Sequence, residues 1–406
     1  MVLVLSGCVA APAPPPTPSP STSAAADRLP QVRRTVEGLA RAALVNDRSA
    51  FFGLTSDRDP TFDSRVRLLY DNLIALPLAD LSFTPEPEER PLPSSRQAVL
   101  GADAWIQPVV VRWRLTADDQ PAVHRVWLTF VPEPTEVRLA GTFDRPTAEP
   151  PGQVPSWWQG PLTVGQRGKV TVLAGSGQSA DRWLAVVRPA TAAVQRDLPA
   201  AAGNWAGQVV VEVPATPADF AAVLGQTAGR YAGIAAVAHQ VGDGDQPPLR
   251  MVVNPRSGTL VTGEQLAEII RHEVVHVATR SSESPAPLWA VEGLAEWVAL
   301  RSHSGGTSFG TADLLTAVRR NGPPPALPRD EAFAADRAEL NRAYAEAWLA
   351  CRYVAETYSV ADLGRLYAEL DGGRSLDEAS RAVLGVDAGA LTAGWQRYLV
   401  GQARAR

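Results

Sequence analysis

The residues whose spacing best suits chemistry are His272, Glu273 and His276, which form an H-E-x-x-H pattern. Thr262 followed by Gln265 predicts a capped helix start, and apolar residues recur at helical spacing through this segment. Because residues four apart share one face of a helix, the two histidines can present imidazole nitrogens to one zinc ion. Glu273 is then predicted to act beside the metal as a general base.

A third ligand is expected on the next predicted helix, at Glu292. A catalytic zinc site needs three protein ligands and one open position, and the turn-rich segment 281–287 allows that helix to fold back. Glu296 lies one helical turn after Glu292 and is predicted to hydrogen-bond a ligand histidine. The competing interpretations are an ordinary helix with two histidines and a solvated acidic pair, although apolar residues surround both glutamates.

Together these patterns resemble the gluzincin metallopeptidases, the thermolysin-like and peptidase MA-like group. Segment 289–295 reads W-A-V-E-G-L-A, which is similar to the W-x-x-E-G-x-A form of gluzincin aminopeptidases. The resemblance covers roughly residues 205–400 in order. It implies Zn²⁺ held by His272, His276 and Glu292, in a cleft between an α/β lobe and a helical lobe.

The resemblance also implies a role for Tyr344, because a tyrosine at the start of a later helix stabilises the oxyanion in gluzincin aminopeptidases. This chain reads Tyr344-Ala-Glu-Ala and lacks the lysine and glycine of the family's Y-x-K-G, so a core tyrosine is an equal alternative. The amine-binding G-x-M-E-N segment is also missing. Stretch 249–255, predicted as the strand beside a bound peptide, carries no glutamate, which favours an endopeptidase.

Composition limits the class of protein. The chain has 406 residues, of which 45% are hydrophobic and 20% charged, as expected for two or three globular domains. The net charge of −5 gives no general attraction to nucleic acid, and no nucleic-acid partner is expected. The excess of arginine over lysine, with abundant alanine and proline, is typical of a GC-rich bacterial genome.

The N-terminal residues predict an envelope lipoprotein. Residues 1–8 end in Leu-Ser-Gly-Cys8, which resembles a bacterial lipobox and predicts lipidation of Cys8. The apolar run before it is short and has no basic residue, so the true translation start is expected upstream. Residues 9–29 are predicted to be a disordered tether rich in Pro, Ala and Ser. The predicted location is extracytoplasmic, on the outer face of the cell membrane, with the lipid anchor as the membrane contact.

The predicted fold class is α+β. Residues 30–147 are predicted as an NTF2-like accessory domain, since two amphipathic helices precede strand-like runs. Residues 156–406 are predicted as a gluzincin-like domain with a small α/β lobe and a helical lobe. Within the α/β lobe, Trp183–Val187 is predicted as a strand leading to a helix over 189–201.

The predicted function is zinc-dependent hydrolysis of peptide bonds by a metal-activated water. The substrate class is polypeptide, and the protein is predicted to be an envelope-anchored endopeptidase. The alternative is a catalytically silent, lipid-anchored binding or scaffold protein with a peptidase-like domain. Stoichiometric zinc distinguishes the two, because a scaffold does not need it.

Overall fold

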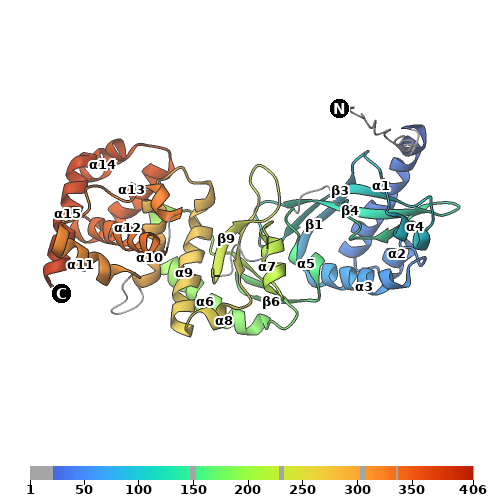
Figure 1. The fold of residues 1–406 in the computed structure, drawn as a ribbon, viewed down its shortest axis with the longest axis horizontal. Helices are drawn as coiled ribbons and strands as arrows, with labels where there is room; N and C mark the ends of the chain where they lie inside the picture. The colour runs from blue at the N-terminus through green and yellow to red at the C-terminus, as the bar shows by residue number, and fades with distance from the viewer. Residues whose placement is uncertain (1–21, 147–151, 228–232, 302–307, 335–336, 406) are drawn as a thin grey trace, which may run out of the picture.

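A computed structural model describes residues 22–146, 152–227, 233–301, 308–334 and 337–405. The fold is mixed α+β, as predicted, and contains two separate sheets. Three parts follow one another along the long axis of the molecule: an N-terminal sheet with its helices, a second sheet, and a lobe of helices that holds the C-terminus (Figure 1). The lipobox, Cys8 and residues 9–21 of the predicted tether lie outside the described residues. The prediction of a disordered tether is wrong for residues 22–29, which belong to helix α1 (Thr22–Leu44).

The N-terminal part is an antiparallel sheet with four helices, three of which precede its first strand, whereas the fourth lies between its second and third strands. Its helices are α1 (Thr22–Leu44), α2 (Arg48–Gly53), α3 (Pro60–Ala75) and α4 (Ser94–Leu100). Its strands are β1 (Leu78–Pro85), β2 (Arg90–Pro91), β3 (Trp105–Leu115), β4 (Ala122–Pro132) and β5 (Val137–Gly141). The order across the sheet is β1-β3-β4-β5, with β2 also beside β3. The specific likeness to an NTF2 cone stays a prediction.

The second sheet contains both parallel and antiparallel strands. Its strand order decides which strand lies at the edge next to α9 (Gly263–Thr279), the helix that carries the H-E-x-x-H pattern. Its strands are β6 (Leu162–Arg167), β7 (Val170–Gly175), β8 (Val209–Val213), β9 (Ala236–Gln240) and β10 (Leu249–Val253). The order across the sheet is β6-β7-β8-β10-β9, where β7, β8 and β10 are parallel and both edge strands are antiparallel. Its accompanying helices are α5 (Ser156–Gln159), α6 (Ala180–Asp197), η1 (Ala200–Ala202), α7 (Pro217–Val223) and α8 (Ser257–Leu260).

Two sequence predictions in this region are wrong. The stretch predicted to run beside a bound peptide forms β10, which is an interior strand, and the edge position belongs to β9. The predicted strand Trp183–Val187 is instead part of α6, which runs from Ala180 to Asp197 through Pro189. Ser179 caps this helix, and the buried Trp183 and Val187 lie on one of its faces. The cap and the helical burial pattern outweigh the β-propensity of the segment and the proline.

Both faces of the second sheet are covered. Val172 and Val211 belong to a large apolar core shared with α6 and the helical lobe, whereas Leu173 and Val210 belong to the core of the N-terminal part. This alternation follows from the two-residue period of β-strands. The sheet is therefore packed between the other two parts, and Trp157 joins the N-terminal core as well. The predicted boundary between residues 147 and 156 stays a prediction.

The C-terminal part consists of helices. They are α9 (Gly263–Thr279), η2 (Ser281–Glu283), α10 (Leu288–Arg301), α11 (Thr311–Asn321), η3 (Asp330–Ala334), α12 (Arg337–Thr357), α13 (Val360–Asp371), α14 (Leu376–Leu384) and α15 (Ala388–Ala405). α9 lies between the second sheet and the remaining helices (Figure 1). It contacts β9 and β10 on one side and α10 on the other.

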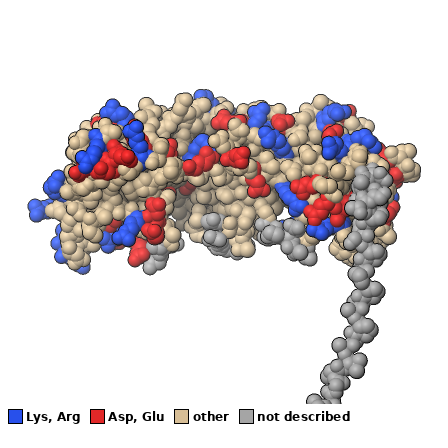
Figure 2. Space-filling view, turned by 90° about the horizontal axis from the view of Figure 1, so that it is seen from above, with Lys and Arg blue, Asp and Glu red and all other residues tan. Residues whose placement is uncertain are grey.

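The surface shows no broad region of one charge on the face seen in Figure 2, where acidic and basic side chains lie intermixed. Among the described residues, no helix is both long and apolar enough to cross a membrane.

Candidate metal centre

Helix α9 places the two histidines of the H-E-x-x-H pattern on one face. Thr262 and Gln265 form the predicted capping box, and each side chain accepts a hydrogen bond from the other residue's backbone N–H. The apolar face of α9, which includes Ile270 and Val274, is fully buried in the large core and fixes the rotation of the helix. As a result, the Nε2 atoms of His272 and His276 lie 2.9 Å apart.

Helix α10 brings Glu292 to the same point. Its Oε2 lies 3.1 Å from Nε2 of His272 and 3.4 Å from Nε2 of His276. Gly293 allows the approach of α12 behind this helix, because a Cβ there would lie 2.5 Å from the carbonyl oxygen of Ala347. Within the described part of the chain, these three residues are the one group of histidine, cysteine or carboxylate side chains suitably placed to hold a metal ion.

The geometry and donor types fit a divalent metal such as zinc. Ligand atoms about 2.0–2.1 Å from a tetrahedral zinc ion lie about 3.3–3.4 Å from one another. The three observed separations of 2.9, 3.1 and 3.4 Å are close to that value. Two imidazole nitrogens and one carboxylate oxygen also suit other first-row metals, so the donor set by itself does not select zinc.

Outer hydrogen bonds orient both histidines. Oε2 of Glu296 lies 3.3 Å from Nδ1 of His272, which is the arrangement the sequence prediction requires. The hydroxyl of Ser281 lies 2.7 Å from Nδ1 of His276. With a proton on each Nδ1, both Nε2 lone pairs would face each other and Glu292, and a proton or a metal ion between them would relieve their repulsion. Ser281 was not predicted from the sequence.

Glu273 lies beside this group and outside it. Its Oε2 accepts a hydrogen bond of 2.7 Å from the backbone N–H of Ala238 in β9. Burial raises the pKa of Glu273, and the two histidines partly oppose that rise. The carboxylate therefore has one oxygen held by the edge strand and is separate from the three candidate ligands, as a general base must be.

Tyr344 reaches the same site from α12. Its ring centre lies 6.0 Å from that of His272, and its hydroxyl forms a hydrogen bond with Glu292. Burial, followed by the nearby Glu292 carboxylate, raises the pKa of the phenol well above its ordinary value, so the hydroxyl keeps its proton. Phe333 of η3 packs edge-on against Tyr344 with ring centres 5.5 Å apart, a contact that the sequence analysis did not identify.

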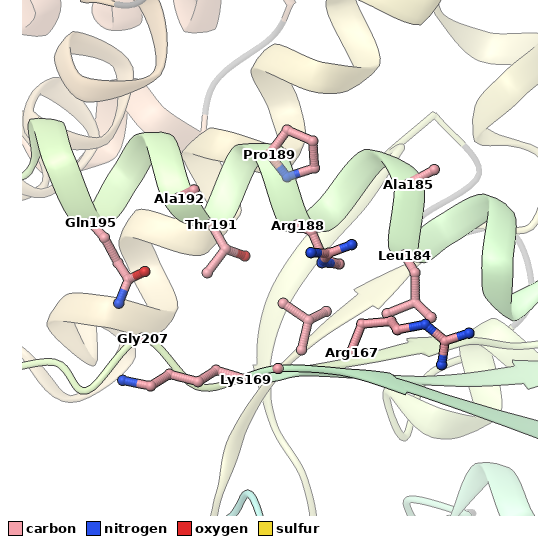
Figure 3. A pocket seen from close by; sticks show the side chains of 12 residues that line it. Arg167, Lys169, Leu184, Ala185, Arg188, Pro189, Thr191, Ala192, Gln195 and Gly207 are labelled. Carbon is pink, nitrogen blue, oxygen red and sulfur yellow. The ribbon is translucent and has the colours of Figure 1, made fainter.

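A hollow elsewhere in the molecule has a different lining. A groove of about 470 Å³ runs between α6 and the turn from β6 to β7, with Arg167, Lys169 and Arg188 among its residues (Figure 3). The side chains of Arg167 and Lys169 extend toward opposite ends of this groove (Figure 3). No carboxylate or imidazole lines it, so it offers none of the ligand types of the candidate metal centre.

Comparison with known proteins assigns the chain to no family. No family model matches the chain, and no curated protein is significantly similar to it.

Proposed function

We propose that this protein is a zinc-dependent hydrolase of peptide bonds. The proposal is carried by one observation: nitrogens of His272 and His276 and an oxygen of Glu292 converge, while Glu273 lies beside them without joining them. Three protein ligands leave a fourth position for water or substrate, which is the pattern of catalytic zinc sites rather than structural ones.

The chain supplies groups for each proton movement in the reaction. When bound, zinc supplies a Lewis acid for the scissile carbonyl and a water of lowered pKa. Glu273 accepts a proton from that water and then donates it to the nitrogen of the departing amine. The protonated hydroxyl of Tyr344, which bonds Glu292 in the structure, turns to donate its hydrogen bond to the oxygen that gains negative charge. Water adds to the carbonyl carbon, the C–N bond breaks, and no covalent enzyme intermediate forms.

The edge strand β9 offers a place for an extended substrate. At its two ends, Asn254 N–H donates to the carbonyl of Ala235 and Val241 N–H donates to the carbonyl of Pro248. Odd-numbered residues of β9 therefore face β10, and the backbone groups of Ala236 and Ala238 face the outer edge. A polypeptide pairing with this edge would pass directly beside Glu273, because Ala238 already contacts that carboxylate.

The lining of this edge supports cleavage within a chain rather than at its amino end. Neither β9 nor β10 contains an acidic residue that would bind a substrate's free amine. Lipid anchoring through Cys8 on the outer face of the cell membrane is part of the same proposal and places the substrates among extracytoplasmic polypeptides.

The proposal is tested with peptides whose amino ends are blocked. The wild-type protein should contain about one zinc per chain and cleave internal bonds of such peptides. Glu273→Gln should keep the zinc and lose about 10³-fold or more in kcat, since an amide cannot accept the proton. Glu264→Gln is the matched control, because this exposed glutamate lies in the first turn of the same helix.

Three results count against the proposal. A wild-type protein that holds zinc without hydrolysing any peptide would favour the scaffold alternative. Loss of zinc in Glu273→Gln would exchange the roles of Glu273 and Glu292. Blocked peptides that stay intact while free peptides lose single amino-terminal residues would replace the endopeptidase with an aminopeptidase.

A further inference from the structure

The N-terminal part contacts the hairpin that carries the edge strand through a buried charge cluster. Asp118, in the turn between β3 and β4, bonds the guanidinium of Arg250 on β10 with both carboxylate oxygens. The distance from Nε of Arg250 to Oδ1 of Asp118 is 3.3 Å, and Nη2 donates to Oδ2. Asp118 is separated from Arg250 by 132 positions in the sequence, so this contact joins two parts of the molecule.

This cluster fixes Arg250 in one orientation. The side chain is 0% exposed, and its Nη1 donates to Oε1 of Glu212 on β8 at 2.8 Å. Its guanidinium also lies 4.3 Å from the ring centre of Trp113 on β3. A planar guanidinium bonded on two sides and stacked on a third has no alternative rotamer that keeps its charge compensated. The register of β10 is therefore tied to the N-terminal sheet.

A second set of contacts holds the far end of β9. The N–H of Asp243 donates to the carbonyl of Val123 on β4 at 2.7 Å, which extends the N-terminal sheet by one bridge. Gly242 has a φ of +86°, and a Cβ there would lie 2.6 Å from the oxygen of Val123. Gln153 also bonds the N–H of Gly242 and the carbonyl of Gln240. The chain leaving β9 is thus pressed against β4.

The Arg250 cluster lies next to the backbone group that bonds Glu273, the candidate catalytic base. In the β9–β10 pairing, Arg250 stands opposite His239, and the next residue, Ala238, donates its N–H to Glu273. Any shift of β10 or of the end of β9 therefore moves the one described backbone group that bonds this carboxylate, and moves the edge that would align a substrate.

We infer that Asp118 is a positioning residue for the site. It acts on β9 through Arg250 of the neighbouring strand β10. The N-terminal part then does more than pack against the second sheet, because its contacts hold the edge strand β9 in place beside Glu273. The catalytic half of this inference rests on the proposed peptidase function. The structural half, that Asp118 holds β9, does not.

The test compares two charge-removing substitutions in the N-terminal part of the full chain. Asp118→Asn places an amide N–H₂ against the guanidinium and breaks the two-oxygen contact. Asp59→Asn breaks a pair in which a similarly buried carboxylate accepts from Arg96 at 2.7 Å. Arg96 is 27% exposed, and that pair does not touch β9 or β10. Each variant removes one buried carboxylate charge from the N-terminal part, so a general loss of stability appears in both.

Three measurements separate positioning from general packing. Asp118→Asn should keep about one zinc per chain, exchange the amides of residues 236–241 about tenfold faster, and lower kcat about tenfold with a smaller change in KM. Asp59→Asn should match the wild type in all three. Asp118→Glu, which restores two carboxylate oxygens, should recover part of the exchange protection and of kcat.

A second pair of variants tests the other end of β9. Gly242→Ala forces a methyl group against Val123 and should reproduce both the faster exchange and the loss of kcat. Gly244→Ala is its control, since Gly244 also has a positive φ but has nothing within 4 Å of an added Cβ.

Equal exchange of residues 236–241 in Asp118→Asn and Asp59→Asn would overturn the inference. Faster exchange without any loss of kcat would overturn the positioning role as well. If the wild-type protein hydrolyses no peptide, the proposed function fails, while the exchange comparison still decides whether Asp118 holds β9.

Discussion

Two buried polar clusters in this protein differ in the source of their positive charge. In the first, the chain supplies it: Arg250 is enclosed by Asp118 and Glu212 with no exposed surface. In the second, His272 and His276 meet Glu292, and no described arginine or lysine bonds any of them. The first cluster is closed by its own cation, whereas the second is complete only with a proton or a metal ion from outside.

The difference separates a structural role from a chemical one. A guanidinium keeps its proton at any ordinary pH, so the Arg250 cluster can hold two sheets in register but cannot itself transfer a proton or bind a metal ion. Imidazole nitrogens and a carboxylate are exchangeable metal ligands, and the neighbouring Glu273 can gain and lose a proton. The two clusters lie on either side of one hairpin, which links the fixed cluster to the reactive one.

The largest expected effect comes from removing a ligand of the second cluster, His272, His276 and Glu292, here called the open cluster. His276→Ala should leave less than stoichiometric zinc and reduce peptide hydrolysis to background, because two ligands do not hold zinc in a catalytic site. Metal analysis of the purified variant checks this. The wild-type protein should also lose activity in a chelator and regain it on addition of zinc, whereas the variant should not. Unchanged zinc in His276→Ala would end the ligand assignment.

The first cluster, Arg250 with Asp118 and Glu212, is here called the closed cluster. Substitutions in it should change the stability of the protein rather than its metal content. Arg250→Met leaves Asp118 and Glu212 buried without a cation and should lower the free energy of unfolding by about 3–5 kcal/mol. Denaturation in urea measures it. Arg67→Met is the control, because Arg67 forms an exposed pair with Asp63, and its loss should not be separable from error. Equal effects would show that the Arg250 cluster is no more than an ordinary ion pair.

Much of the open cluster could be predicted from the sequence because its geometry depends on residues that are close together in the chain. The capping box of Thr262 and Gln265 fixes the start of α9, and helical spacing then places His272 and His276 on one face. Glu292 required only that the next helix fold back. The class α+β and the helices of the C-terminal part followed from the same periodicity.

What the sequence did not predict depends on contacts between distant segments. Ser281 reaches His276 because Arg280 has a left-handed backbone with a φ of 49°, and nothing in the spacing reveals that turn. The partner of Glu273 is a backbone N–H, which has no sequence signature, and the exchange of β9 for β10 at the edge follows from tertiary pairing. The closed cluster escaped notice for the same reason, since Asp118 and Arg250 meet only when two sheets pack.

A smaller effect is expected at Tyr344, whose hydroxyl bonds Glu292 of the candidate metal centre. Tyr344→Phe should keep zinc and lower kcat about 10²-fold, because the oxyanion loses a hydrogen-bond donor. Steady-state kinetics on a blocked peptide measures it. Tyr398→Phe is the control, since its hydroxyl bonds Glu356, a residue remote from the ligands in sequence, on an exposed surface. Unchanged kcat with a lower Tm in Tyr344→Phe would make this residue a core tyrosine.

The smallest effect should come from the outer hydrogen bond of His276. Ser281→Ala removes the oxygen 2.7 Å from Nδ1 and should weaken zinc affinity about tenfold while leaving kcat at saturating zinc nearly unchanged. Competition with a chromophoric chelator measures the affinity. Ser284→Ala is the control, because this serine is in the same turn and caps the N–H of Ala286 instead of a histidine. If the two variants bind zinc equally well, packing of α9 alone orients His276. If only Ser281→Ala weakens binding, the left-handed turn after α9 is part of the metal centre.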